Sequence, residues 1–253
     1  MYLLDMAPGA SGPASIVHRA DPALRIVLAS GFACAVVSLQ TFAALLLALV
    51  LAITTLVVSG VGVGTTLKRM VAMDTFIVFM LLTLPFTVAG TPAFQVLGLT
   101  ASTEGLHLAF RIVLKANAIV LMLLTMVGSM ESVMFGHALA RLSVPQNLVN
   151  LLMFTVRYID VLQDEYLRLR TAMRARGFQP DNSRHTYRTF GYVVGMLLIR
   201  AVERSERILD AMKCRGFAGK IHMLDERSWT PLDTRLAVFA TGAVGLVLTV
   251  EWW

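Results

Sequence analysis

The longest apolar run of the chain, from Ala23 to Val58, is too long for one ordinary membrane helix. It covers 36 residues, and its only polar cluster is Ser38, Gln40 and Thr41, near the middle. As a single helix it would be about 54 Å long, whereas the hydrocarbon core of a bilayer is about 30 Å thick. We therefore expect two short helices with a tight turn at the polar cluster. A single, strongly tilted helix is the alternative.

The composition of the chain excludes an ordinary soluble protein. Of the 253 residues, 57% are hydrophobic and 15% are charged, and the mean hydropathy is +0.70; a soluble domain carries about 25% charged residues. The net charge of +6 comes from basic residues that lie between and after the apolar runs, which favours contact with the anionic surface of a lipid bilayer. Aromatic and basic residues do not alternate as base stacking requires, so no nucleic-acid partner is expected.

Three further apolar stretches predict membrane helices, at about 70–88, within 104–128 and at 236–250. Between the last two lies a segment with 16 of the 22 lysine and arginine residues, which indicates helices that face water. The predicted fold is an all-α, polytopic membrane protein with about five transmembrane helices. Its expected parts are an N-terminal segment, four membrane spans, a cytoplasmic helical domain, and a last span with the C-terminus, at residues 1–22, 23–128, 129–235 and 236–253.

The distribution of lysine and arginine predicts the orientation of the chain. With five spans and a cytoplasmic start, Lys68, Arg69 and the basic segment face the cytoplasm. The turn at 38–42, the loop at 89–103 and the C-terminus then face outside, and none of them carries lysine or arginine. The agreement with the positive-inside rule supports a cytoplasmic N-terminus and an outside C-terminus.

The basic segment contains an internal repeat with an offset of 39 residues. Seven residues from Ala172 to Phe178, Ala-Met-Arg-Ala-Arg-Gly-Phe, recur from Ala211 to Phe217 as Ala-Met-Lys-Cys-Arg-Gly-Phe. Five of the seven positions are identical, and a sixth exchanges arginine for lysine. Chance rarely produces such a match, so we expect the two copies to share one role.

Each copy is expected to end a charged helix. Asp164 precedes Arg168, and Glu203 precedes Arg207, by the four residues that support a helix. Glycine readily takes the left-handed conformation that ends a helix, and arginine in the last turn suits the negative end of the helix dipole. The copies are either two ordinary caps on solvated helices or two equivalent contacts with a partner. In a contact, the guanidinium would pair with acidic or carbonyl groups and the phenylalanine would enter a pocket.

Short membrane spans followed by paired helices with Arg-Gly ends resemble the T components of energy-coupling factor (ECF) transporters. That family has a pair of Ala-Arg-Gly-type motifs. The corresponding motifs of this chain are Ala175-Arg176-Gly177 and Cys214-Arg215-Gly216. Cysteine replaces alanine in the second motif, and both residues are small. From about Arg157 to Lys220 the chain is similar in particular to the CbiQ-type subunit of cobalt and nickel importers.

The resemblance implies a non-catalytic subunit of a bacterial-type inner (plasma) membrane. In this family, two cytoplasmic ATPase subunits bind ATP and Mg²⁺ and move two coupling helices that cross in an X. These helices reorient a substrate-specific membrane S component, here of the cobalt- or nickel-binding type, and a small accessory membrane subunit can join the complex. The expected ATPase contacts are the two motifs and the residues that follow them, Phe178 and Phe217. The chain lacks a GxxxxGK[ST] motif, so we expect it to bind no nucleotide or other cofactor.

A polar stripe of His107, Arg111 and Lys115 lies at the start of the fourth span. It fits ordinary polar packing, or a contact with the S component, because ionisable groups in a span usually face protein or water. The histidines and cysteines of the chain do not have metal-ligand spacing, so no metal site is expected.

Other functions remain as alternatives. Shared T components of vitamin importers have the same Arg-Gly ends. A self-sufficient channel or secondary transporter usually shows paired membrane repeats and charged groups at mid-span, whereas the repeat here lies in the basic segment. An integral-membrane enzyme needs clustered catalytic side chains, and the sequence indicates none.

Overall fold

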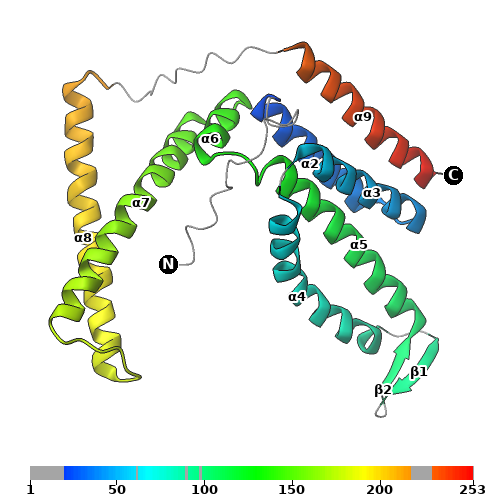
Figure 1. Cartoon of the computed structure of the whole chain (residues 1–253), viewed down its shortest axis with the longest axis horizontal. Helices are drawn as coiled ribbons and strands as arrows, with labels where there is room; N and C mark the ends of the chain where they lie inside the picture. Colours follow the sequence, from blue (N-terminus) through cyan, green and yellow to red (C-terminus); the bar gives the residue numbers. More distant parts are fainter. Residues whose placement is uncertain (1–19, 61, 89–90, 97–98, 218–229, 253) are drawn as a thin grey trace. The chain divides into compact units, whose positions relative to one another are not determined.

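The computed structural model describes residues 20–60, 62–88, 91–96, 99–217 and 230–252 of the chain (Figure 1). Almost all of the secondary structure in these residues is helical, as expected for an all-α polytopic membrane protein. The chain divides into two compact units. Unit 1 contains Met1–Phe135 and Arg227–Trp253, and unit 2 contains Gly136–Glu226.

Unit 1 consists of long helices and one short hairpin. In chain order its elements are α2 (Pro22–Ser38), α3 (Phe42–Ser59), α4 (Val63–Thr87), β1 (Pro92–Val96), β2 (Leu99–Ser102), α5 (Thr103–Met126) and α9 (Pro231–Glu251). Among the residues that the structure describes, α3, α5 and α9 are long and apolar enough to cross a membrane, and α2 is a shorter apolar helix of 17 residues.

The predicted turn inside the first apolar run is confirmed. α2 ends at Ser38, and the next residue, Leu39, is extended, with φ −68° and ψ 140°. Thr41 is also extended and precedes the first residue of α3, Phe42. The run therefore forms two helices and not a single tilted one.

Two helices start earlier than the apolar pattern predicts. α4 begins at Val63 instead of near residue 70, and α9 begins at Pro231 instead of 236. The apolar pattern marks the part of a helix that suits hydrocarbon, whereas the helix itself begins at its cap. For α9 the cap is Thr230 with Asp233, a capping box with proline at the start of the helix.

The core of unit 1 lies where α2, α3 and α5 pack together. On α3, Ala44, Ala48 and Ala52 recur every four residues, so they share one face, and all three are fully buried. Phe32 of α2 and Ala118 of α5 belong to the same cluster. Lipid tails are as apolar as leucine, so membrane helices associate through close packing, which small residues permit. The alanine stripe therefore lets α3 approach its neighbours closely.

An antiparallel hairpin replaces the loop expected at 89–103. β1 pairs with β2, with Gln95 opposite Thr100. β-Branched and aromatic residues in this stretch favour strands, whereas its lack of lysine and arginine carries no information on secondary structure. At the base of the hairpin, the N–H of Thr91 donates to the Glu104 carboxylate (2.8 Å), which ties it to the start of α5.

Buried polar groups join the starts of α2 and α9. The N–H of Asp21 donates to Oδ1 of Asp233 (2.8 Å), and Oδ2 accepts the N–H (2.9 Å) and the hydroxyl (2.7 Å) of Thr230. One turn further along α2, Arg25 donates to the hydroxyl of Ser129 (2.5 Å), just after α5. Asp21, Arg25 and Asp233 are at most 3% exposed. These bonds fix three helices at one end of unit 1.

Unit 2 contains two long helices, α7 (Gln146–Ala175) and α8 (Arg184–Cys214), and most of the short α6 (Ser132–Arg141). Pro145 precedes the first residue of α7, and its fixed φ suits the start of a helix. α7 and α8 run antiparallel (Figure 1). Glu165 of α7 pairs with Arg200 of α8, and Phe178, just after α7, packs near the start of α8.

We predict that Gly105→Ala destabilises unit 1. A Cβ atom on Gly105 would lie 2.9 Å from the Cα atom of Pro85 in α4, and overpacking of this kind costs about 1–3 kcal/mol. The thermal unfolding midpoint of the purified protein in detergent should therefore fall. Gly242→Ala is the matched control, because nothing lies within 4 Å of its added Cβ, and alanine should favour the helix by about 0.5–1 kcal/mol. If Gly105→Ala has the same unfolding midpoint as the unmodified protein, this result would contradict the close approach of α5 to α4.

We also predict that Asp233→Ala loosens α9. The change leaves the buried N–H of Asp21 and the donors of Thr230 without their acceptor, at about 1–3 kcal/mol for a buried unsatisfied group. The unfolding midpoint should fall further than in Asp160→Ala, which removes an exposed carboxylate from α7. A midpoint equal to that of the unmodified protein would mean that α9 does not need this tie.

Candidate functional site

The first copy of the repeat forms a Schellman cap at the end of α7. The helix ends at Ala175, and Gly177 has a φ of 78°, in the left-handed region. The N–H of Phe178 donates to the carbonyl of Met173 (3.1 Å), and the N–H of Gly177 donates to that of Arg174 (3.0 Å). These two bonds define the Schellman arrangement, and the left-handed glycine predicted from the sequence is confirmed.

The second copy forms the same cap at the end of α8. The helix ends at Cys214, and Gly216 has a φ of 80°. The N–H of Phe217 donates to the carbonyl of Met212, and the N–H of Gly216 donates to that of Lys213, both at 3.0 Å. The sequence repeat is therefore a repeat of one backbone structure at two helix ends. We call Arg176, Gly177 and Phe178 the first tip, and Arg215, Gly216 and Phe217 the second tip.

The cap accounts for three of the identical residues but not for the arginine. The glycine supplies the left-handed conformation, and Schellman caps often carry an apolar contact between the positions that methionine and phenylalanine occupy here. Arg176 and Arg215 are exposed. Within the described parts of the chain, neither side chain has a hydrogen-bond or ion-pair partner. Both guanidinium groups are therefore available to bind a carboxylate or carbonyl group of another protein.

The surroundings of the two phenylalanines differ. Phe178 packs edge-on against Phe190, with ring centroids 6.1 Å apart, and its ring centroid lies 6.3 Å from that of His185. Phe217 lines an apolar groove of about 360 Å³ between α7 and α8, together with Met212. Both rings therefore pack against other residues of unit 2. Insertion of either ring into a pocket of a partner stays a prediction.

The two tips lie at opposite ends of the antiparallel pair of α7 and α8 (Figure 1). α8 alone has 31 residues, which corresponds to about 46 Å. Between the tips, the buried carboxylate of Glu165 and Arg200 form an ion pair that joins the helices. Exposed basic side chains at and next to the tips are Arg170, Arg174, Arg176, Lys213 and Arg215. The candidate site is therefore two separate, positively charged surfaces on one pair of helices.

The polar stripe at the start of α5 packs against the turn between α2 and α3. The rings of His107 and Phe42 are 5.7 Å apart, and the Arg111 guanidinium lies 5.0 Å from the centre of the same phenylalanine ring. Lys115 donates to the carbonyl of Val37 (2.9 Å), near the end of α2. Polar packing within unit 1 accounts for these contacts. Contact with an S component stays a prediction, and His107 is exposed, which leaves it surface for such a contact.

Sequence reasoning missed two carboxylates that hold helix ends. Asp233 was recognisable, because Thr230-Pro-Leu-Asp233 has the spacing of a capping box. Glu251, at the end of α9, accepts the N–H groups of Gln40 (2.8 Å) and Thr41 (3.0 Å), where α3 begins. A negative charge is favourable at that end of a helix. No local pattern relates Glu251 to residues 211 positions earlier.

Metal-ligating side chains do not gather anywhere in the described part of the chain. No group of three or more His, Cys, Asp or Glu residues there is placed to hold a metal ion. Cys34 and Cys214 are free and exposed, and Cys214 belongs to the last turn before the second tip.

Comparisons with known proteins match most of the chain. Residues 13–224 match the family model CbiQ, described as a cobalt transport protein. Over 248 residues the chain is 24% identical to the energy-coupling factor transporter transmembrane protein EcfT of Ruminiclostridium cellulolyticum, which covers 93% of this chain and 91% of that protein.

Two further relatives match shorter segments. Over 154 residues the chain is 25% identical to the cobalt transport protein CbiQ of Rhodobacter capsulatus, covering 61% of this chain and 59% of that protein. An 83-residue segment is 36% identical to an uncharacterized protein of Methanocaldococcus jannaschii, covering 33% of this chain and 31% of that protein. The matched segments thus span less than two thirds of these two relatives.

The family model covers far more than half of the chain, and the apolar helices of unit 1 are those of a multi-pass membrane protein. This chain belongs to the CbiQ cobalt transport protein family, as a T component of the energy-coupling factor type.

Proposed function

We propose that this chain is the energy-coupling membrane subunit of an ATP-driven ECF importer for cobalt or nickel ions. It joins two cytoplasmic ATPase subunits to a substrate-binding S component in the membrane, and a small accessory membrane subunit completes the proposed complex. ATP and Mg²⁺ bind to the ATPases. The chain itself contributes no catalytic residue and passes the movement of the ATPases to the S component.

The observation that carries this proposal is the pair of tips. One chain presents the same capped helix end twice, each with an exposed arginine that the cap does not need. The two tips lie at opposite ends of a helix pair about 46 Å long, so each reaches a different copy of a partner. Two copies of one ATPase meet this requirement, because they offer the same binding groove twice.

The chemistry of the tips favours an acidic or carbonyl-lined groove on the ATPase. A guanidinium forms two parallel hydrogen bonds to a carboxylate, which fixes orientation as well as position. The left-handed glycine turns the chain sharply after each arginine, so the arginine stands at an exposed corner. A tip bound in this way passes both a translation and a rotation of the ATPase to its helix.

The length of α7 and α8 and the ion pair between them allow the two helices to carry such a movement over a distance. α7 and α8 have 30 and 31 residues, and the ion pair of Glu165 and Arg200 joins them between the tips. Leu151 of α7 and Val194 and Leu198 of α8 are apolar and at least 64% exposed. Exposed apolar surface of this kind marks a binding site for protein or membrane. In our proposal it contacts the S component.

The family name supports cobalt as the transported ion. The proposal also includes nickel, because cobalt and nickel importers share this type of T component. A vitamin importer with a shared T component is the alternative, because the tips do not contact the cargo in either case. The proposed orientation places the N-terminus and unit 2 in the cytoplasm and the end of α9 outside, in an inner (plasma) membrane of bacterial type.

We predict that Arg176→Ala and Arg215→Ala each weaken binding to the ATPase, and that the double variant abolishes it. Each change removes a charge-assisted contact worth about 1.5–3 kcal/mol, which corresponds to roughly a tenfold or greater loss of affinity. The measurement is co-purification through the tagged ATPase from membranes that also contain the S component, with ATP-dependent cobalt and nickel uptake in the same cells.

Arg168→Ala and Arg207→Ala are matched controls for charge. Both remove exposed arginines from the same two helices, outside the tips, and both should retain ATPase binding and uptake. If the double tip variant binds the ATPase as well as these controls do, the tips are ordinary helix caps. Ion uptake by the chain without any ATPase would favour a channel.

The proposed orientation predicts opposite labelling of two cysteines. In a Cys34→Ala background, Cys214 should react with a membrane-impermeant maleimide only after the cells are permeabilised, because it lies beside the second tip. A cysteine introduced as Trp252→Cys, in a Cys34→Ala and Cys214→Ala background, should react in intact cells, since Trp252 is 91% exposed at the end of α9. The reverse pattern would mean an inverted orientation.

A further inference from the structure

The two tips share one backbone structure but have different electrostatic surroundings. The nine residues 170–178, which end in the first tip, contain three arginines and no carboxylate. The equivalent residues of the second copy, 209–217, contain two basic residues and one carboxylate, Asp210. Lys213 lies 3.5 Å from this carboxylate, so part of the positive charge at the second tip is compensated locally. The first tip is therefore the more positive of the two.

The start of α8 adds further positive charge beside the first tip. The chain passes from the first tip directly into α8 (Figure 1), and the ring centroid of Phe178 lies 6.3 Å from that of His185. Arg184 is the first residue of α8, Arg188 lies about one turn further, and Asp181 is the one carboxylate in 179–188. The sequence after the second tip, 218–229, contains two carboxylates and two lysine or arginine residues, so it adds no net charge.

Helix stability does not account for Arg184. The start of a helix is the positive end of its dipole, which favours acidic side chains and disfavours basic ones. The first turn of α8 has no acidic residue, and Arg184 stands at its first position. Arg174 and Arg176, at the end of α7, occupy positions that the dipole favours. An arginine that opposes the dipole of its own helix indicates a role outside that helix.

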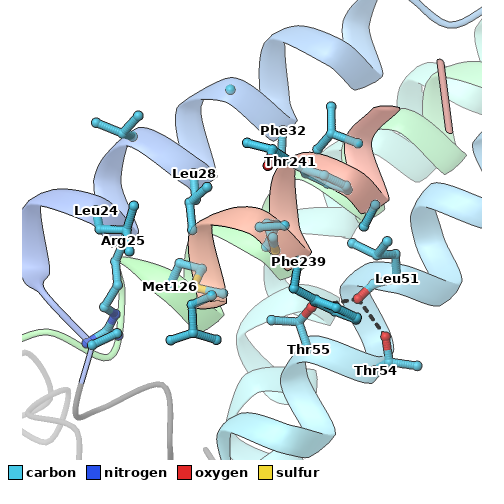
Figure 2. Close-up of a pocket in the computed structure, with 18 of the residues that line it drawn as sticks. Leu24, Arg25, Leu28, Phe32, Leu51, Thr54, Thr55, Met126, Phe239 and Thr241 are labelled. Atoms are coloured by element: carbon cyan, nitrogen blue, oxygen red, sulfur yellow. Dashed lines mark hydrogen bonds between the residues drawn. The ribbon is translucent and has the colours of Figure 1, made fainter. Parts of the chain in front are cut away.

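Arginines with a structural role in this chain are engaged by other groups. Arg25 is 3% exposed and donates to a hydroxyl group of unit 1, and Figure 2 shows its side chain extending from the first turn of α2. Arg200 pairs with Glu165. Arg174 and Arg184, by contrast, are exposed, and within the described parts of the chain neither side chain has a hydrogen-bond or ion-pair partner.

Five exposed arginines form what we call the basic patch: Arg170, Arg174, Arg176, Arg184 and Arg188. The Arg188 side chain contacts the ring and the hydroxyl of Tyr192, which leaves its charge uncompensated because the hydroxyl is neutral. Charge of one sign on a surface attracts an oppositely charged partner and raises its association rate by roughly 10- to 1,000-fold. The partner that fits the basic patch therefore carries carboxylates around its binding groove.

We propose that the ATPase docks first at the first tip, where carboxylates around its groove meet the basic patch, and that the second tip binds afterwards through short-range contacts. This inference rests on the coupling function proposed above, and it adds the acidic chemistry of the groove and the order in which the tips bind. Complementary charge acts mainly on the rate of association. Arg176 and Arg215, which both tips share, hold the complex once it has formed.

The test measures the association and dissociation rates of the ATPase on the full chain. The chain and its S component are held in phosphatidylcholine nanodiscs on a biosensor surface, and the ATPase is supplied in solution. The double variant Arg174→Gln and Arg184→Gln removes two charges from the basic patch and leaves both tips intact. At about 50 mM NaCl we expect association to slow roughly fivefold or more, with dissociation changed less than about twofold. At about 500 mM NaCl the difference should disappear, because salt screens the charges.

The double variant Lys213→Gln and Arg207→Gln is the matched control on α8. Lys213 is the repeat equivalent of Arg174, and the two changes remove the same charge as the patch variant. Association should slow less than about twofold, since Asp210 already compensates Lys213. Equal slowing by the two double variants would mean that neither tip binds first, and it would overturn the inference.

The same measurement separates a failure of this inference from a failure of the proposed function. If the ATPase does not bind the unmodified chain with its S component, the coupling function fails, and the inference fails with it. If the ATPase binds, but the patch variant associates at the unmodified rate in low salt, only the inference fails.

Anionic lipid is the competing partner for the basic patch. Phosphatidylcholine carries no net charge, so slower association of the patch variant in these nanodiscs reports contact with the ATPase. A patch effect that appears only in nanodiscs containing phosphatidylglycerol would assign the basic patch to the membrane surface and overturn the inference.

Discussion

The main-chain N–H and C=O groups at helix ends are the constraint on which this structure depends. Every α-helix leaves its first N–H groups and its last C=O groups without partners inside the helix, and lipid supplies none. The chain divides one apolar run into α2 and α3, and so creates two such ends within a few residues. Lys115 from α5 binds a carbonyl at the end of α2, and Glu251 from α9 binds two N–H groups at the start of α3. Each partner has the charge that the helix dipole favours at that end.

The two units meet this constraint in different ways. In unit 1 two helix starts also bind carboxylates far away in the sequence, Asp233 and Glu251, so these bonds fix one helix against another. In unit 2 the ends of α7 and α8 are closed by their own backbone, through Gly177 and Gly216. Because the backbone completes each cap by itself, the neighbouring side chains are not needed to hold the helix end. An arginine there is therefore available for binding.

The sequence predicted features that local patterns determine, and missed those that depend on distant contacts. The turn in the first apolar run followed from its length and from the cluster around Gln40, and the left-handed conformation of Gly177 followed from the repeat. The sequence did not predict the hairpin of β1 and β2, because the lack of charge in this stretch carries no information on secondary structure. The role of Glu251 was beyond reach, since a single acid at the end of an apolar helix does not reveal which helix end it meets. The polar stripe was found, but its contacts with Phe42 required the packing of α5 on α3.

The antiparallel order of α7 and α8 has a geometric consequence for the tips. Two equal ends that point in opposite directions along one helix pair are exchanged by a half-turn about an axis near the Glu165–Arg200 ion pair. The pair therefore presents the same cap twice, in two places that this half-turn approximately exchanges. A symmetric homodimer could accept it equally well in either of two orientations related by that axis. The different surroundings of Phe178 and Phe217 are the feature that distinguishes the two orientations.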